Sequence, residues 1–293
     1  MTKVLVFGVA GQLGNALGQA VWPTGWDVTA LDMPDIDFTK PEGLRAVIQR
    51  MKPVLIINAA AYTAVDKAEA ETVLNWTINA VAPAVIAEEA RKIGAALVHV
   101  STDYVYSGTK DEPWIETDPV GPLGGYGSAK VASEMAVTAL VDRHLILRTS
   151  WVYAAHGNNF VKTMLRVGRE RDRLTVVDDQ WGRPTDAADL GDGIILAAHH
   201  ALTKDADWGT YQFSNSGEPV TWCGFAREIF ARSAPWYGKG PEVAAIPTSE
   251  YPTPARRPPN SVMSLDKWRK AFGHTPRAWP EALDSVLAAL RDQ

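Results

Sequence analysis

The sequence predicts an α/β protein in which a doubly wound parallel sheet is followed by a smaller C-terminal domain. Three observations support this prediction. A glycine-rich turn, GVAGQLG, stands near the N-terminus between an apolar segment and a helical pattern. Segments typical of strands then alternate with segments typical of helices through the first half of the chain, which indicates parallel βαβ units. After about residue 150 this alternation becomes irregular.

Strands are expected where short apolar runs end at glycine or at polar residues. The runs are continuous rather than alternating, as expected when helices cover both faces of a sheet. They occupy residues 3–7, 28–31, 54–57, 96–100 and 144–148. Helices are expected where apolar residues recur at helical spacing, and these patterns occupy residues 13–21, 41–51 and 73–93.

The composition excludes several classes of function. A formal net charge of −5 and an isoelectric point of about 5.7 leave no basic surface for nucleic acid. The single cysteine, Cys223, rules out an internal disulfide and is typical of a reducing compartment. No stretch approaches the roughly eighteen apolar residues of a membrane span. The sequence therefore predicts a cytoplasmic globular protein that binds neither nucleic acid nor membrane.

The glycine turn predicts a nucleotide site. Gly8, Gly11 and Gly14 follow the first expected strand and open the first expected helix. Glycine is needed where the chain turns with positive φ and where the backbone must approach a pyrophosphate closely, and the N–H groups of a helix N-terminus hold phosphates. Such a triplet is weak evidence alone, but its place between a strand and a helix predicts a Rossmann-type dinucleotide-binding domain.

Asp32 ends the second expected strand, where an acidic side chain can hydrogen-bond the adenosine ribose. An acid at this position disfavours a 2′-phosphate and therefore favours NADH. The preference is mild, because the loop of residues 33–40 could rearrange around either nucleotide. The alternative is that Asp32 is an ordinary loop acid.

The change in composition predicts the domain organisation. Residues 1–150 are expected to form the dinucleotide-binding domain, which also takes a segment near residues 184–205. Residues 151–293 are expected to form mostly a substrate-binding domain, with segments interleaved between the two. The chain contains 11 tryptophans, and those in its second half could line a pocket for a planar or sugar-like ligand.

The stretch GGYGSAKVASE places Tyr126 and Lys130 one helical turn apart and therefore on one helix face. Reducing a ketone by hydride leaves an alkoxide that must be protonated, and a free phenol has a pKa of about 10. A nearby ammonium group favours the phenolate, so we expect Lys130 to lower the pKa of Tyr126. Thr102, at the carboxyl end of an expected strand, could hydrogen-bond the same carbonyl oxygen, and Lys130 could also reach the nicotinamide ribose. An exposed Lys and a half-buried Tyr at a helix start are the alternative.

Together these residues resemble the extended short-chain dehydrogenase/reductase family and, within it, the dTDP-4-dehydrorhamnose reductases. Motifs shared with that group run from the first strand to near the C-terminus. The widespread one is GVAGQLG, and the narrower ones are NAAAYTAVDKAE (58–69), STDYVYSG (101–108), YGSAKVASE (126–134), LRTSWVYAAHGNNFVKTMLR (147–166) and YPTPARRPPNS (251–261). The resemblance implies reduction of the 4-keto group of dTDP-4-dehydro-L-rhamnose, with Tyr126 as proton donor, Lys130 tuning it and Thr102 orienting the carbonyl.

The resemblance also implies binding roles, residue by residue. The cofactor would contact Gly8, Gly11, Gln12, Leu13, Gly14, Asp32, Asp37, Phe38, Ala59, Ala60, Ala61, Tyr126 and Lys130. The nucleotide-sugar would contact Thr63, Val65, Thr102, Asp103, Trp151 and Arg257, the last with a charge that suits a diphosphate. The family accepts NADPH or NADH and is usually described with NADPH, which opposes the preference deduced from Asp32, so both cofactors stay open.

The motifs also bear on metal binding and on oligomeric state. Some similar proteins hold a divalent ion at a dimer contact through glutamates, but the corresponding positions here are Ala16 and Ala188, which cannot bind a metal. No metal site is therefore expected, and the protein could be a monomer or a homodimer. Two other functions are considered: a nucleotide-sugar epimerase or dehydratase with tightly bound NAD, and a non-catalytic regulatory subunit of the same fold.

Overall fold

The computed structural model describes residues 1–203 and 206–292. Its centre is a six-stranded sheet whose strands all run parallel. In spatial order the strands are β10 (Gly209–Gln212), β5 (His144–Thr149), β4 (Ala96–Thr102), β3 (Leu55–Asn58), β1 (Thr2–Phe7) and β2 (Trp26–Leu31). The predicted doubly wound sheet is therefore confirmed, and its strand order reverses between β1 and β3, where ligands bind in such sheets.

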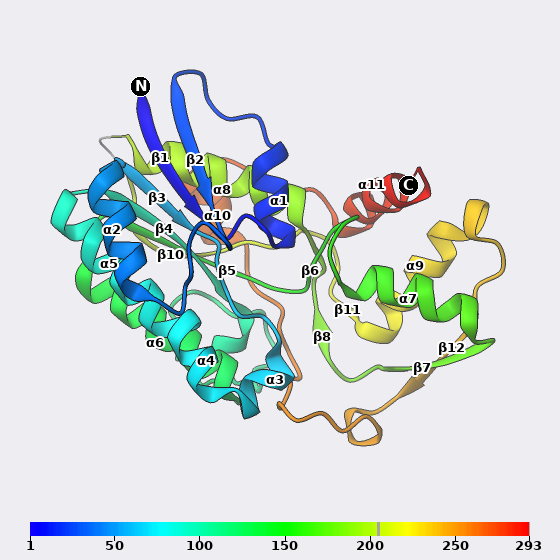
Figure 1. The fold of residues 1–293 in the computed structure, drawn as a ribbon. Coiled ribbons are helices and arrows are strands. Elements are labelled where there is room, and N and C mark those ends of the chain that lie inside the picture. The colour runs from blue at the N-terminus through cyan, green and yellow to red at the C-terminus, as the bar shows by residue number, and fades with distance from the viewer. Residues whose placement is uncertain (204–205, 293) are drawn as a thin grey trace.

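Helices cover both faces of this sheet (Figure 1), which explains its continuous apolar strands. Along β1, Val4 and Val6 belong to one buried cluster, whereas Leu5 and Phe7 belong to the other. The first cluster includes residues of α1 (Gln12–Gln19), α8 (Ala187–Ala201) and α10 (Asp266–Phe272), and the second includes residues of α2 (Pro41–Met51), α5 (Ala82–Ile93) and α6 (Gly125–Leu140).

The segment expected to be one helix, 73–93, is helical but interrupted. It contains α4 (Thr72–Trp76), a π-helical turn (Thr77–Val81) and α5, and it follows the short helix α3 (Val65–Ala70). Pro83 lies in the first turn of α5, where its ring would clash with a carbonyl of an uninterrupted helix. The π turn also carries the buried Asn79, whose side chain bonds both the N–H and the carbonyl of Tyr62.

A smaller lobe packs beside the sheet and carries the C-terminus (Figure 1). Its helices are α7 (Phe160–Glu170), α9 (Trp222–Tyr237) and α11 (Trp279–Arg291). Its strands form three short pairs: β7 (Arg173–Val177) with β12 (Glu242–Ile246), β8 (Trp181–Gly182) with β11 (Val220–Thr221), and β6 (Val152–Tyr153) with β9 (Thr185–Asp186). Short 3₁₀ turns occur at Asp103–Val105 and Thr248–Glu250.

The chain passes repeatedly between the sheet and the smaller lobe. After entering the lobe it returns to the sheet as α8 and β10, leaves again through α9, and returns as α10 before ending in α11. The boundaries 1–150 and 151–293 stay a prediction about independent units. Within the predicted segment near 184–205, α8 packs on the sheet, where β10 and α10 also lie, whereas residues 204–205, like residue 293, lie outside the described residues. Within the described residues, no helix is both long enough and apolar enough to cross a membrane.

Candidate active site

A cleft of about 620 Å³ lies at the carboxyl ends of the central strands and reaches the smaller lobe. It brings together nearly all of the side chains predicted to bind ligands. Those that line it are Gly8, Gly11, Gln12, Leu13, Gly14, Asp32, Phe38, Ala59, Ala60, Ala61, Thr63, Val65, Thr102, Asp103, Tyr126, Lys130 and Trp151. Asp37 and Arg257 do not line it.

The glycine turn is shaped by close backbone contacts. Gly8 has a φ of +91°, and a Cβ there would lie 2.3 Å from the Ala60 nitrogen. A Cβ on Gly14 would lie 2.1 Å from the Gly8 carbonyl oxygen. Both contacts exclude any larger residue. Gly11 caps the N-terminus of α1 and has open space beside it, so the turn offers a cradle that suits a pyrophosphate.

Asp32 is held against this turn. One carboxylate oxygen accepts from the Ala10 N–H at 2.7 Å, and the other accepts from the Met33 N–H at 2.8 Å. The carboxylate therefore supports the glycine turn while it lines the cleft. Asp32 can therefore support the glycine turn and still bind a ribose in the cleft.

Asp37 and Phe38 are neighbours in the sequence and were both predicted to bind the cofactor, but only Phe38 lies at the cleft. Phe38 lines the cleft and packs edge-on against Phe7, with ring centroids 5.9 Å apart. Asp37 instead accepts hydrogen bonds from the backbone and hydroxyl of Thr39 and forms an ion pair with Lys40. The Thr39 hydrogen bonds lower the pKa of Asp37 to about 2.

Tyr126 and Lys130 both lie in the first half of α6 and are buried, with exposures of 7% and 1%. The Lys130 ammonium donates to the Val100 carbonyl oxygen at 2.8 Å. Burial raises the pKa of Tyr126, and Thr102 is the neighbouring side chain that opposes this shift. The expected lowering by Lys130 is therefore wrong for this structure, because desolvation of the phenol dominates and the ammonium faces a carbonyl. Burial lowers the pKa of Lys130 to about 8.

Thr102 and Asp103 end β4 beside the tyrosine. The Thr102 hydroxyl donates to Asp103 Oδ1 at 3.1 Å and accepts from the Tyr104 N–H at 3.2 Å. Asp103 is only 2% exposed, and burial raises its pKa to about 6. No described residue meets its second oxygen, Oδ2, in hydrogen-bond geometry, although the Ser261 side chain is near enough to oppose the rise in pKa. A polar group of a ligand would satisfy it.

Trp151 closes the cleft from the side of the smaller lobe. Its ring stacks on Trp222 with centroids 3.5 Å apart and planes inclined by 11°. Trp222 opens α9 and also lines the cleft. The sequence analysis missed Trp222 as an individual residue, and only the abundance of tryptophan in the second half pointed toward it. Tyr104, which packs edge-on against Tyr126 at 5.6 Å, was also missed.

Arg257 lies outside the cleft. It forms an ion pair with Asp66 at 2.7 Å and donates to the Ala255 carbonyl at 2.9 Å. The guanidinium group that was expected to meet a diphosphate is therefore engaged by Asp66 in this structure, in a charge-assisted hydrogen bond, and its role as a ligand stays a prediction.

Ala16 and Ala188 differ in environment. Ala16 is buried in a small apolar cluster with Ala154 and Ala187, whereas Ala188 is exposed. Across residues 1–203 and 206–292, no group of three or more His, Cys, Asp or Glu side chains could hold a metal ion.

Comparison with known proteins yields a consistent set of similarities. The family model described as "RmlD substrate binding domain" matches residues 1–292. A dTDP-4-dehydrorhamnose reductase of Escherichia coli K12 is 43% identical, over 98% of each chain. A solved dTDP-4-dehydrorhamnose reductase of Bacillus anthracis in complex with NADP is 36% identical, with a TM-score of 0.90 over 98% of this chain and 99% of that one. A Thermus thermophilus UDP-glucose 4-epimerase in complex with NAD, 23% identical with a TM-score of 0.81 over 99% of each chain, shares the fold.

Proposed function

The chain belongs to the dTDP-4-dehydrorhamnose reductase family, and on that premise we propose that it reduces the C4 keto group of dTDP-4-dehydro-L-rhamnose to give dTDP-L-rhamnose. The observation that carries this proposal is the single cleft that unites the glycine turn with Thr102, Tyr126 and Lys130. NADPH or NADH is the proposed hydride donor, as the NADP complex of the Bacillus relative supports for the family.

The residues of the glycine turn fit a dinucleotide. Gly11 leaves the N-terminus of α1 open, and the small side chains of Ala59, Ala60 and Ala61 border the same part of the cleft. We assign the pyrophosphate to Gly11, Gln12 and Leu13, and the adenosine end to Asp32 and Phe38. Asp37 stays a weaker proposal for the adenosine, because its carboxylate is engaged by Thr39 and Lys40. When bound, the reduced nicotinamide supplies the hydride.

Tyr126 is proposed to donate the proton. A raised pKa keeps this proton on the phenol at neutral pH, so the hydroxyl is available as a hydrogen-bond donor to the substrate carbonyl. An alkoxide is a much stronger base than a ketone oxygen, and the proton moves from the Tyr126 oxygen only when that base develops. Thr102 would hold the same oxygen, and Lys130 would neutralise the phenolate that remains.

The sugar and its nucleotide are proposed to occupy the rest of the cleft. Thr63, Val65 and Asp103 line it from the sheet side, and Trp151 lines it from the smaller lobe. The unpartnered Asp103 oxygen suits a sugar hydroxyl. Arg257 stays a proposed ligand of the diphosphate, with Asp66 as the competing partner for its guanidinium group.

One assay tests the proposal. Purified protein is given dTDP-4-dehydro-L-rhamnose with NADPH or NADH, oxidation is followed at the nicotinamide absorbance, and the sugar product is identified by NMR. Tyr126→Phe serves as the control. Oxidation of either cofactor, together with formation of dTDP-L-rhamnose from the keto sugar, supports the proposal. Nucleotide that survives dialysis, with no net oxidation, would instead indicate an epimerase or dehydratase. In dehydratases an Asp-Glu pair often follows the Thr, whereas this chain has Asp103 and Tyr104 there.

Full binding of both ligands without turnover would indicate a regulatory subunit. The intact set of Thr102, Tyr126 and Lys130 is the observation against that function. The number of subunits, one or two, is read from the same preparation by light scattering.

A further inference from the structure

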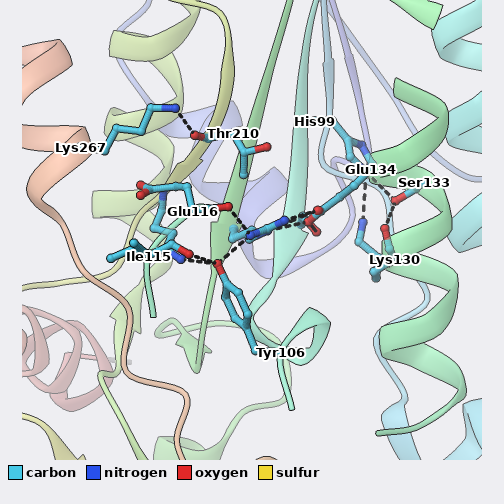
Figure 2. Close-up of polar contacts among 12 residues, drawn as sticks. His99, Tyr106, Ile115, Glu116, Lys130, Ser133, Glu134, Thr210 and Lys267 are labelled. Carbon is cyan, nitrogen blue, oxygen red and sulfur yellow. Dashed lines mark hydrogen bonds and ion pairs between the residues drawn. The ribbon is translucent and has the colours of Figure 1, made fainter. Parts of the chain in front are cut away.

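A chain of buried polar side chains lies behind Lys130. It starts at the Ala60 N–H, which donates to Asn58 Oδ1 at 3.2 Å, and continues from Asn58 Nδ2 to His99 Nδ1 at 3.1 Å. His99 Nε2 lies 2.9 Å from the Ser133 hydroxyl, which donates to the Lys130 carbonyl at 2.7 Å. Figure 2 shows His99 and Ser133 close to Lys130, and His99 has no exposed surface.

The direction of every hydrogen bond in this chain follows from its first member. Asn58 Oδ1 accepts from a backbone N–H, so the Asn58 amide must present its NH₂ group to His99. His99 Nδ1 therefore accepts, and in the neutral ring the proton sits on Nε2. The Ser133 hydroxyl can accept that proton because its own hydrogen points to the Lys130 carbonyl.

This tautomer matters because His99 Nε2 also lies 3.4 Å from the Lys130 ammonium. A nitrogen that carries a hydrogen offers no lone pair, so it cannot accept from the ammonium. Among the described residues, that leaves the Val100 carbonyl as the acceptor behind Lys130. An ammonium has three donors, so two of them are not used by the Val100 carbonyl, and Lys130 lines the cleft.

We infer that His99 is a positioning residue, which keeps the Lys130 ammonium directed into the cleft by presenting it with an N–H instead of a lone pair. The inference rests on the proposed function, in which Lys130 serves Tyr126 and, as the family resemblance implies, also binds the cofactor. It adds a role for a residue that does not touch the cleft and that acts only through Lys130.

The surroundings keep His99 neutral. Burial is the main cause that lowers the pKa of His99 well below its ordinary value, and the charges of Lys130 on α6 and His144 on β5 act in the same direction. Asn58 on β3 and Ser133 on α6 are its neutral partners. Protonation would give Nδ1 a hydrogen that faces the Asn58 NH₂ group, so the network itself opposes the charged ring.

The first experiment reads the tautomer without any ligand. Protein labelled with ¹⁵N-histidine is studied by long-range ¹H–¹⁵N correlation at several pH values around neutrality. The chain has six histidines, so the His99 signals are identified by their absence from the spectrum of His99→Gln. The expected result for His99 is a neutral ring with its hydrogen on Nε2, insensitive to pH. A hydrogen on Nδ1 of His99, or a protonated His99 ring, would overturn the inference.

The second experiment compares two substitutions of His99 that have the same shape. His99→Glu places carboxylate oxygens, which only accept, behind the ammonium, whereas His99→Gln can keep the arrangement of the histidine, with Oε1 toward the Asn58 NH₂ group and its own NH₂ group toward Ser133. We expect His99→Glu to raise the Kd for NADPH roughly tenfold, the effect of losing one hydrogen bond to a charged group, while His99→Gln leaves the Kd nearly unchanged. His144→Phe, another buried histidine on the next strand, should lower Tm with the Kd unchanged.

A double-mutant cycle shows whether the effect passes through Lys130. In a Lys130→Met background, His99→Glu should have no further effect on the Kd. An effect of equal size in both backgrounds, or a His99→Glu Kd equal to that of the unmodified protein, would overturn the inference and leave the proposed function standing. If Lys130→Met itself leaves the Kd unchanged, both the cofactor role of Lys130 and the inference fail.

Discussion

The two sides of the cleft are built in different ways. On the side proposed for the cofactor, the glycine turn and the alanines after β3 are held by backbone contacts so close that no larger residue fits at Gly8 or Gly14. On the side proposed for the substrate, Trp151 and Trp222 come from separate segments and meet through one stacked ring contact. Main-chain geometry therefore fixes the side that holds the glycine turn. The side that holds Trp151 and Trp222 depends on individual side chains, and a single substitution can remove one of them.

This difference predicts that substitutions will separate chemistry, substrate binding and cofactor choice. Tyr126, Trp151 and Asp32 all line the cleft. In the proposed assignment, Tyr126 lies where the two sides meet, Trp151 belongs to the substrate side and Asp32 belongs to the cofactor side. The comparison fails if all three substitutions affect the same kinetic parameter.

Tyr126→Phe should have the largest effect. Removing the phenol hydroxyl removes the proposed proton donor, and general-acid steps contribute roughly 10²- to 10⁴-fold. We expect kcat to fall by that factor while the Kd values of both ligands and the Tm stay nearly unchanged, as measured by steady-state kinetics and calorimetry. A decrease below about tenfold would mean that the proton comes from another group.

Trp151→Ala should act next most strongly, on the substrate side alone. We expect the KM for the nucleotide-sugar to rise with little change in Tm or in the KM for NADPH. Trp181→Ala is the matched control, because Trp181 belongs to the same lobe, is 47% exposed and lies outside the cleft. If Trp151 is instead a packing residue, truncation should cost roughly 3–5 kcal/mol of stability, and a large loss of Tm with an unchanged KM would exclude it from the substrate site.

Asp32→Ala should have a smaller effect on the cofactor side. The lost hydrogen bonds would belong to a ribose hydroxyl that NADPH carries phosphorylated, so the Kd for NADH should rise more than the Kd for NADPH. Asp32→Asn is the control that retains an acceptor for the Ala10 N–H. Equal weakening of both cofactors by Asp32→Ala would assign Asp32 to the support of the glycine turn alone.

A chelator should have no effect on either side. Because alanines occupy positions 16 and 188, EDTA is expected to change neither kcat nor the elution volume in size-exclusion chromatography. A chelator-sensitive dimer would show that metal ligands lie elsewhere in the chain.

The contrast between the two sides also explains what the sequence could predict. Local structure sets the relative positions of residues that lie in one βαβ unit or one helix. This applies to Gly8, Gly14 and Asp32 along β1, α1 and β2, and to Tyr126 and Lys130 within α6. Trp222 lies 71 positions after Trp151 by their numbering, and only the folded lobe reveals that they stack. The ion pair of Arg257 with Asp66 likewise depends on a long-range contact.

Two other failures have local physical causes. The tyrosine pKa was expected to fall because spacing shows that Lys130 is near, but spacing does not show that the ammonium bonds the Val100 carbonyl or how deeply the phenol is buried. The π turn before α5 was hidden because its apolar residues keep nearly helical spacing on either side of the interruption.

The backbone of Trp151 has a consequence for protein engineering. Its φ of +50° places a bulky side chain in the left-handed region, which costs on the order of 1–2 kcal/mol for a residue with a Cβ. Glycine at this position would relieve that strain and would also remove the ring from the cleft. Because the same change would also remove the ring that stacks on Trp222, relief of backbone strain alone does not predict a more stable protein, and any variant selected for heat resistance should be screened for turnover at every round.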